Sequence, residues 1–187
     1  MNWLILGLAM LIGVHLIPAV PPLRRWLVAR LGGQAYRGLF SLFALAGLVL
    51  IILGKSHAPF IPLWQPLWWG IGMTPLFMLP AMILLVGAYL PGNVHRLTPH
   101  PMSWAVVLWA IGHLIANGDA ASILLFGSLG LYSLFAIWSG NRRGATRQSR
   151  TMTIDRDLIV IGVGLLLYVA VVFLHPTLFG VPAISGL

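Results

Sequence analysis

Two histidines lie inside long apolar segments, where ionisable side chains are rare. His15 stands in the segment 2–20 and His113 in the segment 101–117. An ionisable group inside a bilayer is costly, so its presence marks a candidate functional site. The simpler alternative is a neutral imidazole that hydrogen-bonds to a neighbouring helix. We therefore expect the two side chains either to hold one metal centre between helices or to join helices structurally.

The chain lacks several common metal-ligating residues, which limits the kinds of metal centre it can hold. The chain has no Cys, which excludes disulfides, thiolate zinc sites, iron–sulfur clusters and covalent haem attachment through C-x-x-C-H. It has no Glu and only three Asp residues, so a di-iron carboxylate site in the membrane is excluded too. Two neutral imidazole nitrogens suit the axial positions of a haem iron. Gly13 and Gly112, close to the histidines, would let a flat macrocycle approach the backbone.

For the other polar residues, both a functional and a simple structural role are considered. Asn117 follows His113 by one helical turn, so its amide could orient the imidazole or a ligand; a helix C-terminal Asn explains it equally well. Arg37 opens the second apolar segment, where anchoring at the membrane surface is the simple account. Hydration at helix ends or loops is an adequate account of the remaining histidines: His57, His95, His100 and His175. No phosphate-binding loop, dinucleotide fingerprint or nucleophile elbow occurs, which disfavours hydrolase and nucleotide-driven functions.

The composition indicates a membrane protein. Of 187 residues, 59% are hydrophobic and 7% charged, and the mean hydropathy is +0.96. That leaves too little polar surface for a soluble or disordered chain. We therefore predict an all-α, polytopic transmembrane helix bundle whose partner is the lipid bilayer. The net charge of +8 is explained by basic cytoplasmic loops, so no nucleic acid partner is expected.

The apolar segments predict about six spanning helices. Their expected ranges are 2–20 (interrupted near Pro18), 36–54, 68–90 (with Pro75 and Pro80 inside it), 101–117, 120–139 and 158–174. Residues 21–35 mix arginines with apolar side chains, which is typical of a short helix lying in the interface. Residues 55–67 are expected to form an interfacial loop, and Asp119 to cap the fifth helix.

The arginines predict the orientation. With this count of helices, one side carries ten basic residues: Arg24, Arg25, Arg30, Arg37, Arg96, Arg142, Arg143, Arg147, Arg150 and Arg156. The other side carries Lys55 alone. The positive-inside rule then places the arginines in the cytoplasm and both termini on the periplasmic side of a bacterial inner membrane.

Several short motifs, in their order, resemble the bacterial NnrU family of integral membrane proteins. They are Gly-Val-His-Leu at 13–16, Tyr-Arg-Gly-Leu-Phe-Ser at 36–41, His-Pro-Met at 100–102, and Leu-Trp-Ala-Ile-Gly-His-Leu-Ile-Ala-Asn-Gly-Asp at 108–119. The resemblance covers about residues 1–140. We therefore divide the chain into an NnrU-like membrane domain of five helices, 1–140, and a basic cytoplasmic loop with a C-terminal transmembrane helix, 141–187.

The resemblance implies a membrane protein associated with denitrification and needed for the expression or activity of nitrite and nitric oxide reductases. The same superfamily includes the zeta-carotene cis–trans isomerase, a b-type haem enzyme with two membrane histidines as candidate ligands. By motif position these correspond to His15 and His113. Two departures matter: Pro99 stands where the family usually has Arg, so Arg37 or Arg96 would have to bind a haem propionate, and Ala110 stands where the isomerase has Cys.

Three functions follow from these observations. The first is a non-covalent haem b protein, with His15 and His113 as metal ligands and Asn117 and Arg37 beside the cofactor, that serves denitrification with a membrane redox partner. The second is a haem-dependent cis–trans isomerase of a polyene or another lipid-soluble substrate. The third is a cofactor-free assembly or regulatory protein in which both histidines are structural.

Overall fold

The computed structural model describes residues 1–66 and 68–183. All its regular elements are helices; the one β-bridge in these ranges joins Pro62 to Asp119. Five helices are long and apolar enough to cross a membrane, and a shorter apolar helix, Pro101–Ala116, corresponds to the expected fourth span. The predicted helical membrane bundle is thus confirmed. Residue 67 of the expected loop 55–67, and residues 184–187 of the expected unit 141–187, lie outside the described residues.

The N-terminal elements follow the predicted boundaries closely. They are α1 (Asn2–Leu16), a 3₁₀ turn (Ile17–Ala19), α2 (Pro21–Leu31) and α3 (Gly33–Ser56). The turn contains Pro18, as expected of a residue that cannot continue the hydrogen bonding of α1. Gly32, with a φ of 81°, separates α2 from α3. Because that break comes early, α3 begins before the expected residue 36.

The later elements differ from the predictions in three places. They are α4 (Gly70–Gly87), α5 (Val94–Leu97), α6 (Pro101–Ala116), α7 (Ala120–Ser122), a π-helical turn (Ile123–Gly127), α8 (Ser128–Arg142) and α9 (Ile154–Phe179). The short α5 and the π turn were not predicted. The sixth span was expected over residues 158–174, but α9 begins at Ile154, holds Asp155 and Asp157 in its first turn, and continues to Phe179. Carboxylates there are favoured by the helix dipole, so charge does not delay the helix start.

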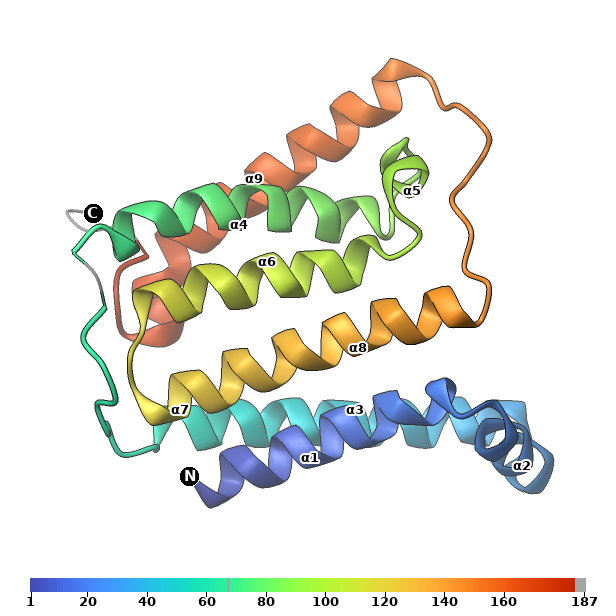
Figure 1. The fold of residues 1–187 in the computed structure, drawn as a ribbon, viewed down its shortest axis with the longest axis horizontal. Helices are drawn as coiled ribbons and strands as arrows, with labels where there is room; N and C mark the ends of the chain where they lie inside the picture. The colour runs from blue at the N-terminus through green and yellow to red at the C-terminus, as the bar shows by residue number, and fades with distance from the viewer. Residues whose placement is uncertain (67, 184–187) are drawn as a thin grey trace.

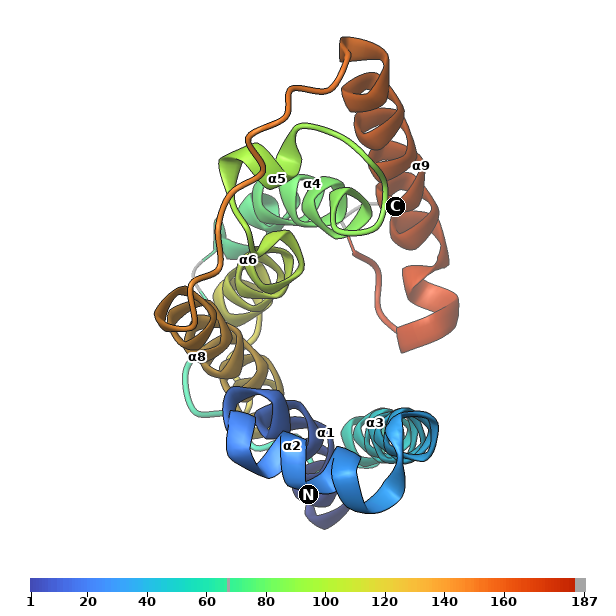
Figure 2. The same ribbon diagram turned by 90° about the vertical axis from the view of Figure 1, so that its right-hand side faces the viewer.

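The six long helices form a single row. Neighbours in it are α3, α1, α8, α6, α4 and α9, an order that differs from their order in the chain. The most extensive contacts join α1 to α3 and α4 to α6, whereas α8 lies between the two pairs. Viewed along the helices, the row bends into an arc with α3 and α9 at its ends (Figure 2).

The two ends of the bundle differ in charge. The start of α1 and the last turns of α9 lie at one end, and α2, α5 and the segment 143–153 lie at the other (Figure 1). All the arginines belong to that second end or to the adjoining helix turns, whereas Lys55 ends α3 at the first. The charge asymmetry inferred from the sequence is therefore an asymmetry between the ends of the folded bundle.

Glycines bring α1 and α3 into close contact. A Cβ added to Gly54 would lie 2.2 Å from the Leu4 backbone nitrogen, and one added to Gly47 would lie 2.9 Å from that of Leu11. Leu4, on the facing side of α1, is fully buried. Small residues at such positions let two membrane helices gain dispersion contacts along their backbones. This pairing fixes α3 beside the helix that carries His15.

We predict that Gly54→Ala destabilises the protein, because the added methyl group must push α1 away from α3. An overpacked core costs about 1–3 kcal/mol, and we expect a clear drop in the melting temperature of the detergent-solubilised protein. Gly38→Ala is the matched control, since a Cβ there meets nothing within 4 Å. Equal melting temperatures for the two variants would contradict the packing described here.

Candidate functional site

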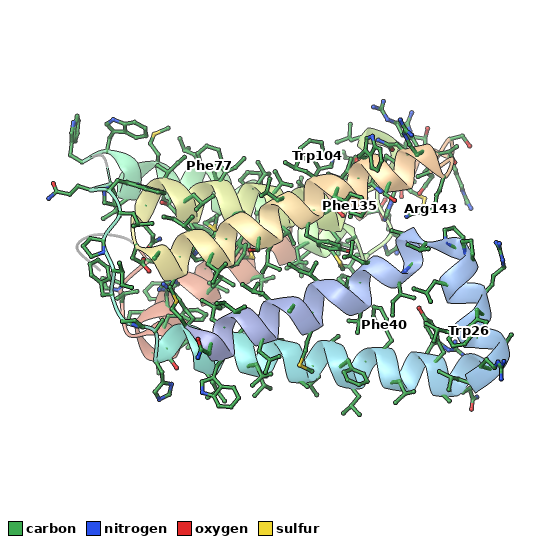
Figure 3. All side chains as sticks on the ribbon, turned by 60° about the horizontal axis from the view of Figure 1, so that its bottom comes forward. Trp26, Phe40, Phe77, Trp104, Phe135 and Arg143 are labelled. Carbon is green, nitrogen blue, oxygen red and sulfur yellow. The ribbon has the colours of Figure 1, made fainter. Side chains whose placement is uncertain are left out.

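His15 lies in the last turn of α1, half-buried among aromatic rings. Its Nδ1 is 2.7 Å from the Leu11 carbonyl oxygen. Its ring centroid is 4.9 Å from that of Phe40 in α3 and 6.1 Å from that of Tyr132 in α8, both edge-on. Figure 3 shows Phe40 between α1 and α3. The Tyr132 hydroxyl donates a 3.0 Å hydrogen bond to the His15 carbonyl, which ties α8 to this turn.

His113 occupies the corresponding place in α6. Its Nδ1 is 2.8 Å from the Trp109 carbonyl oxygen. Its ring stacks on Phe126 with centroids 4.5 Å apart and an interplanar angle of 28°. Phe126 belongs to the π turn before α8. Such turns are rare and frequent at functional sites, and here the turn presents the ring that covers His113.

Both imidazoles have the hydrogen bonding of a metal-binding histidine. When Nδ1–H donates to a backbone carbonyl, the tautomer is set and Nε2 carries the lone pair. Among the described residues, neither Nε2 has a hydrogen-bond partner. Exposed His57 makes the same Nδ1 contact, with Leu53 at 2.9 Å, so the hydrogen bond alone does not distinguish a ligand. What distinguishes His15 and His113 is their place in apolar helices among aromatic rings.

The structure does not join the two histidines directly. His15 contacts α8 at Tyr132, and His113 contacts the π turn at Phe126. Six residues separate these contacts along the fifth span, which is about 9 Å at 1.5 Å per residue. Within the described ranges, no three His, Asp, Glu or Cys side chains gather to hold a metal ion. From these four residue types, the described part of the chain brings at most two side chains together at any one place.

The other expected site residues lie apart from the imidazole nitrogens. The Asn117 amide donates to the His113 carbonyl oxygen at 2.8 Å, the bond of a helix C-terminal residue. Arg37 is exposed, and its Nε donates to the Gly33 carbonyl of its own helix at 3.2 Å. Gly112 faces Met78 of α4, where a Cβ would lie 2.7 Å from the thioether methyl, so its small size serves helix packing. Gly13 has open space beside it.

That open space is part of an apolar groove between α1 and the fifth span. The groove encloses about 400 Å³ and opens outward along the helices. Its lining residues are Ile5, Leu8, Ala9, Ile12, Gly13, Leu16, Leu124 and Ser128. Gly13 and Leu16 flank His15 in the sequence, so the groove runs along the helix that carries this histidine. Its walls suit a hydrocarbon chain.

One polar cluster was not predicted from the sequence. Lys55 Nζ donates to Asp119 Oδ1 at 3.1 Å and to Ser122 Oγ at 2.7 Å. The same carboxylate accepts the Ser122 backbone N–H at 3.0 Å, which confirms the predicted N-cap. Asp119 is 5% exposed and Ser122 is fully buried. The cluster fastens the end of α3 to the start of the fifth span, across 64 residues of sequence.

His100 also joins two helices. Its Nε2 is 2.9 Å from the Asn141 side-chain oxygen, and its ring lies against Gly140, where a Cβ would be 2.4 Å from Cε1. The start of α6 is thereby fixed to the end of α8. The expectation that hydration accounts for His100 omitted this partner, because it lies 41 residues away in the sequence.

Comparison with known proteins identifies the family. The model of the NnrU family, described as NnrU protein, matches residues 3–183. The chain therefore belongs to this family, and the match continues past residue 140 through α9. No curated protein and no solved structure matches the chain significantly.

The Asp119 cluster predicts a dependence of stability on pH. Burial raises the pKa of Asp119, but the hydrogen bonds from Ser122 and Lys55 outweigh it, so the pKa lies below its ordinary value. A carboxyl whose pKa is depressed by folding contributes stability above its unfolded pKa, about 3.9, and loses it as the pH falls further. We expect Asp119→Asn to lower stability at pH 7 by about 1–3 kcal/mol and to flatten the loss below about pH 4.

Thermal melting between pH 3 and 7 checks this expectation. Asp155→Asn is the matched control, because the Asp155 carboxylate is 65% exposed and lies 3.8 Å from Arg156, which is exposed as well. This variant loses only the weak helix-dipole and ion-pair interactions of an exposed carboxylate, so it should change the melting temperature and the pH profile much less than Asp119→Asn does. If the melting temperatures of wild type and Asp119→Asn fall in parallel as the pH is lowered, the Asp119 carboxylate does not cause the pH dependence of stability.

Proposed function

We propose that this NnrU-family protein binds haem b non-covalently in a bacterial inner membrane, and that the imidazoles of His15 and His113 would hold its iron. The observation that carries the proposal is the state of the two imidazoles. Each donates Nδ1–H to the carbonyl one turn earlier and leaves Nε2 without a hydrogen bond. Two such nitrogens suit haem iron, and a chain without Cys offers no thiolate in their place.

The surrounding residues would hold the ligands and exclude water. Phe126 and Trp109 cover the His113 ring, and Phe40 and Tyr132 cover that of His15. The hydrogen bonds to Leu11 and Trp109 fix each ring and raise its basicity. Bound haem would supply a one-electron couple for exchange with a membrane redox partner. Family membership supports a link to denitrification, through the expression or activity of nitrite and nitric oxide reductases.

We also propose that the arginine-bearing end faces the cytoplasm. Ten basic side chains at one end of the bundle against Lys55 at the other support this orientation by the positive-inside rule. Since α1 starts and α9 ends opposite the arginines (Figure 1), both termini would then be periplasmic. In that orientation His15 lies nearer the cytoplasm and His113 nearer the periplasm.

The absorption spectrum of the purified protein tests the haem proposal. Expressed in haem-replete cells, the wild-type protein should show a sharp Soret band and, after dithionite reduction, separated α and β bands. His15→Ala and His113→Ala should each lose the haem or shift it to a five-coordinate spectrum, because each removes one axial ligand. The same variants should fail to restore nitrite reductase activity to a deletion strain grown on nitrate.

His57→Ala is the matched control. Its imidazole makes the same Nδ1 contact with the preceding turn but is exposed at the end of α3. The variant should keep the wild-type spectrum. A colourless wild-type protein would contradict the haem proposal and leave both histidines with a role in helix packing.

The groove beside α1 favours a second function, haem-dependent cis–trans isomerisation of a polyene or similar lipid-soluble substrate. Such an enzyme needs an apolar channel that opens to lipid beside its reactive centre. The groove of about 400 Å³ along α1 has this character. Electron transfer to a partner protein has no need of it.

Ser128→Trp should block this groove, since Ser128 forms part of its wall. If the protein binds polyenes there, a polyene in detergent micelles should shift the Soret band of the wild type but not of Ser128→Trp. Leu131→Trp is the control, because Leu131 is 70% exposed on the same helix and lines no part of the groove. A wild-type spectrum unchanged by polyenes would leave electron transfer as the function of the haem.

A further inference from the structure

Tyr36 carries a buried hydroxyl group without a partner. The residue is 9% exposed, and its hydroxyl oxygen is the one enclosed side-chain polar atom, among the described residues, that has no hydrogen bond. Leaving such a group unpaired costs free energy, and native proteins rarely do so without a reason. The hydroxyl therefore indicates a missing acceptor or donor.

The position of Tyr36 connects this hydroxyl with His15. Tyr36 precedes Phe40 by one turn of α3, and the two rings are 6.3 Å apart. Phe40 in turn contacts the His15 ring at 4.9 Å. The same stripe of α3 continues to Gly47 and Gly54, which lie against α1. Tyr36 thus lies on the α1-facing side of α3, one turn past His15 toward the arginine-bearing end.

The neighbouring Arg37 contrasts with Tyr36. Its guanidinium is exposed and already donates to the Gly33 carbonyl. The two residues are adjacent in the helix, so their side chains point about 100° apart. Of the two, Tyr36 is the enclosed donor on the side of His15. Arg37 adds positive charge nearby, which favours an anionic acceptor at this end.

We propose that the Tyr36 hydroxyl donates a hydrogen bond to a propionate carboxylate of the haem held at His15, and so positions the cofactor. This inference rests on the proposed haem binding. It adds a hydrogen-bond donor for the propionate side of the haem. A phenol donates to a carboxylate more strongly than to a neutral acceptor. An oxygen acceptor at this place would give a partner to the one enclosed side-chain polar atom that lacks a hydrogen bond in the described part of the chain.

Tyr36→Phe tests the proposal because it removes only the oxygen. The protein is reconstituted with haem b or with haem dimethyl ester, whose carboxylates are capped, and transfer of each to excess apomyoglobin is timed. For haem b we expect about tenfold faster loss from Tyr36→Phe than from wild type, the usual worth of a hydrogen bond to a charged group. For the dimethyl ester the two rates should differ by less than about twofold, since the charged acceptor is gone.

Two controls separate positioning from packing. Tyr89→Phe removes the hydroxyl of a tyrosine that is 73% exposed, and it should change neither rate. The melting temperature of haem-free Tyr36→Phe should equal or exceed that of wild type, because an unpaired buried hydroxyl has been removed. Tyr132→Phe, which loses a hydrogen bond to the His15 carbonyl, should melt lower.

The outcomes distinguish this inference from the function on which it rests. A wild-type protein that takes up no haem overturns both. If wild type binds haem b and Tyr36→Phe loses it no faster, the inference about Tyr36 is overturned while the haem proposal stands. Equal acceleration for haem b and its dimethyl ester also overturns it, since the substitution would then act through packing.

Discussion

The cost of an unpaired polar group in hydrocarbon governs this structure. Water cannot satisfy a hydroxyl, amide or charge there, so each must find a partner inside the protein. At the helix ends, too, the fold supplies partners for polar groups through contacts between distant segments. Lys55 pairs with Asp119, and Asn93 donates to both carboxylate oxygens of Asp157 at 2.7 Å, once from its backbone and once from its side chain. The same requirement makes an atom without a partner informative.

By this criterion one enclosed atom of the described chain stands out, the hydroxyl oxygen of Tyr36. Nε2 of His15 and Nε2 of His113 also make no hydrogen bond, although they are not enclosed by protein. Two of these three atoms lie around the junction of α1, α3 and α8. A site inferred from unpaired atoms differs from one inferred from residue type, because it depends on whether neighbouring residues offer a hydrogen-bond partner. His57 has the same residue type and the same Nδ1 contact, yet it is exposed to solvent. The place of His15 and His113 in apolar helices, against aromatic rings, therefore carries more of the argument than the residue type does.

Sequence patterns predicted the helices well because apolar length and proline positions are local properties. Pro18, Pro101 and the Asp119 cap act on the adjoining turn, and each was placed correctly. The start of α9 was missed because its two carboxylates were treated as loop residues, although a first helical turn favours them. The π turn was missed because it follows no apolar or proline pattern; in the structure it contains Phe126, which stacks on His113 of α6.

The site could be predicted only in part, for the same reason. The cost of burying an ionisable group singled out His15 and His113, because their position inside apolar segments can be read from the sequence alone. The partners of Lys55 and His100 lie 64 and 41 residues away, and the helix order that brings them together differs from the chain order. Tyr36 is adjacent to Arg37 in the chain, and no sequence pattern distinguishes the exposure of the two side chains. Only the packing of α3 on α1 shows that one side chain is enclosed and the other exposed.

The arrangement of the row gives a bound cofactor a structural role as well. The pairs α1 with α3 and α4 with α6 have the most extensive contacts, and α8 connects them. His15 belongs to the first pair and His113 to the second. A group that bound both would therefore cross the weaker junction and add its binding free energy to the association of the two pairs. Loss of either ligand would loosen that junction while leaving each pair intact. In such a protein the cofactor and the helix arrangement would stabilise each other, and the proposed site would lie at the weaker junction of the bundle.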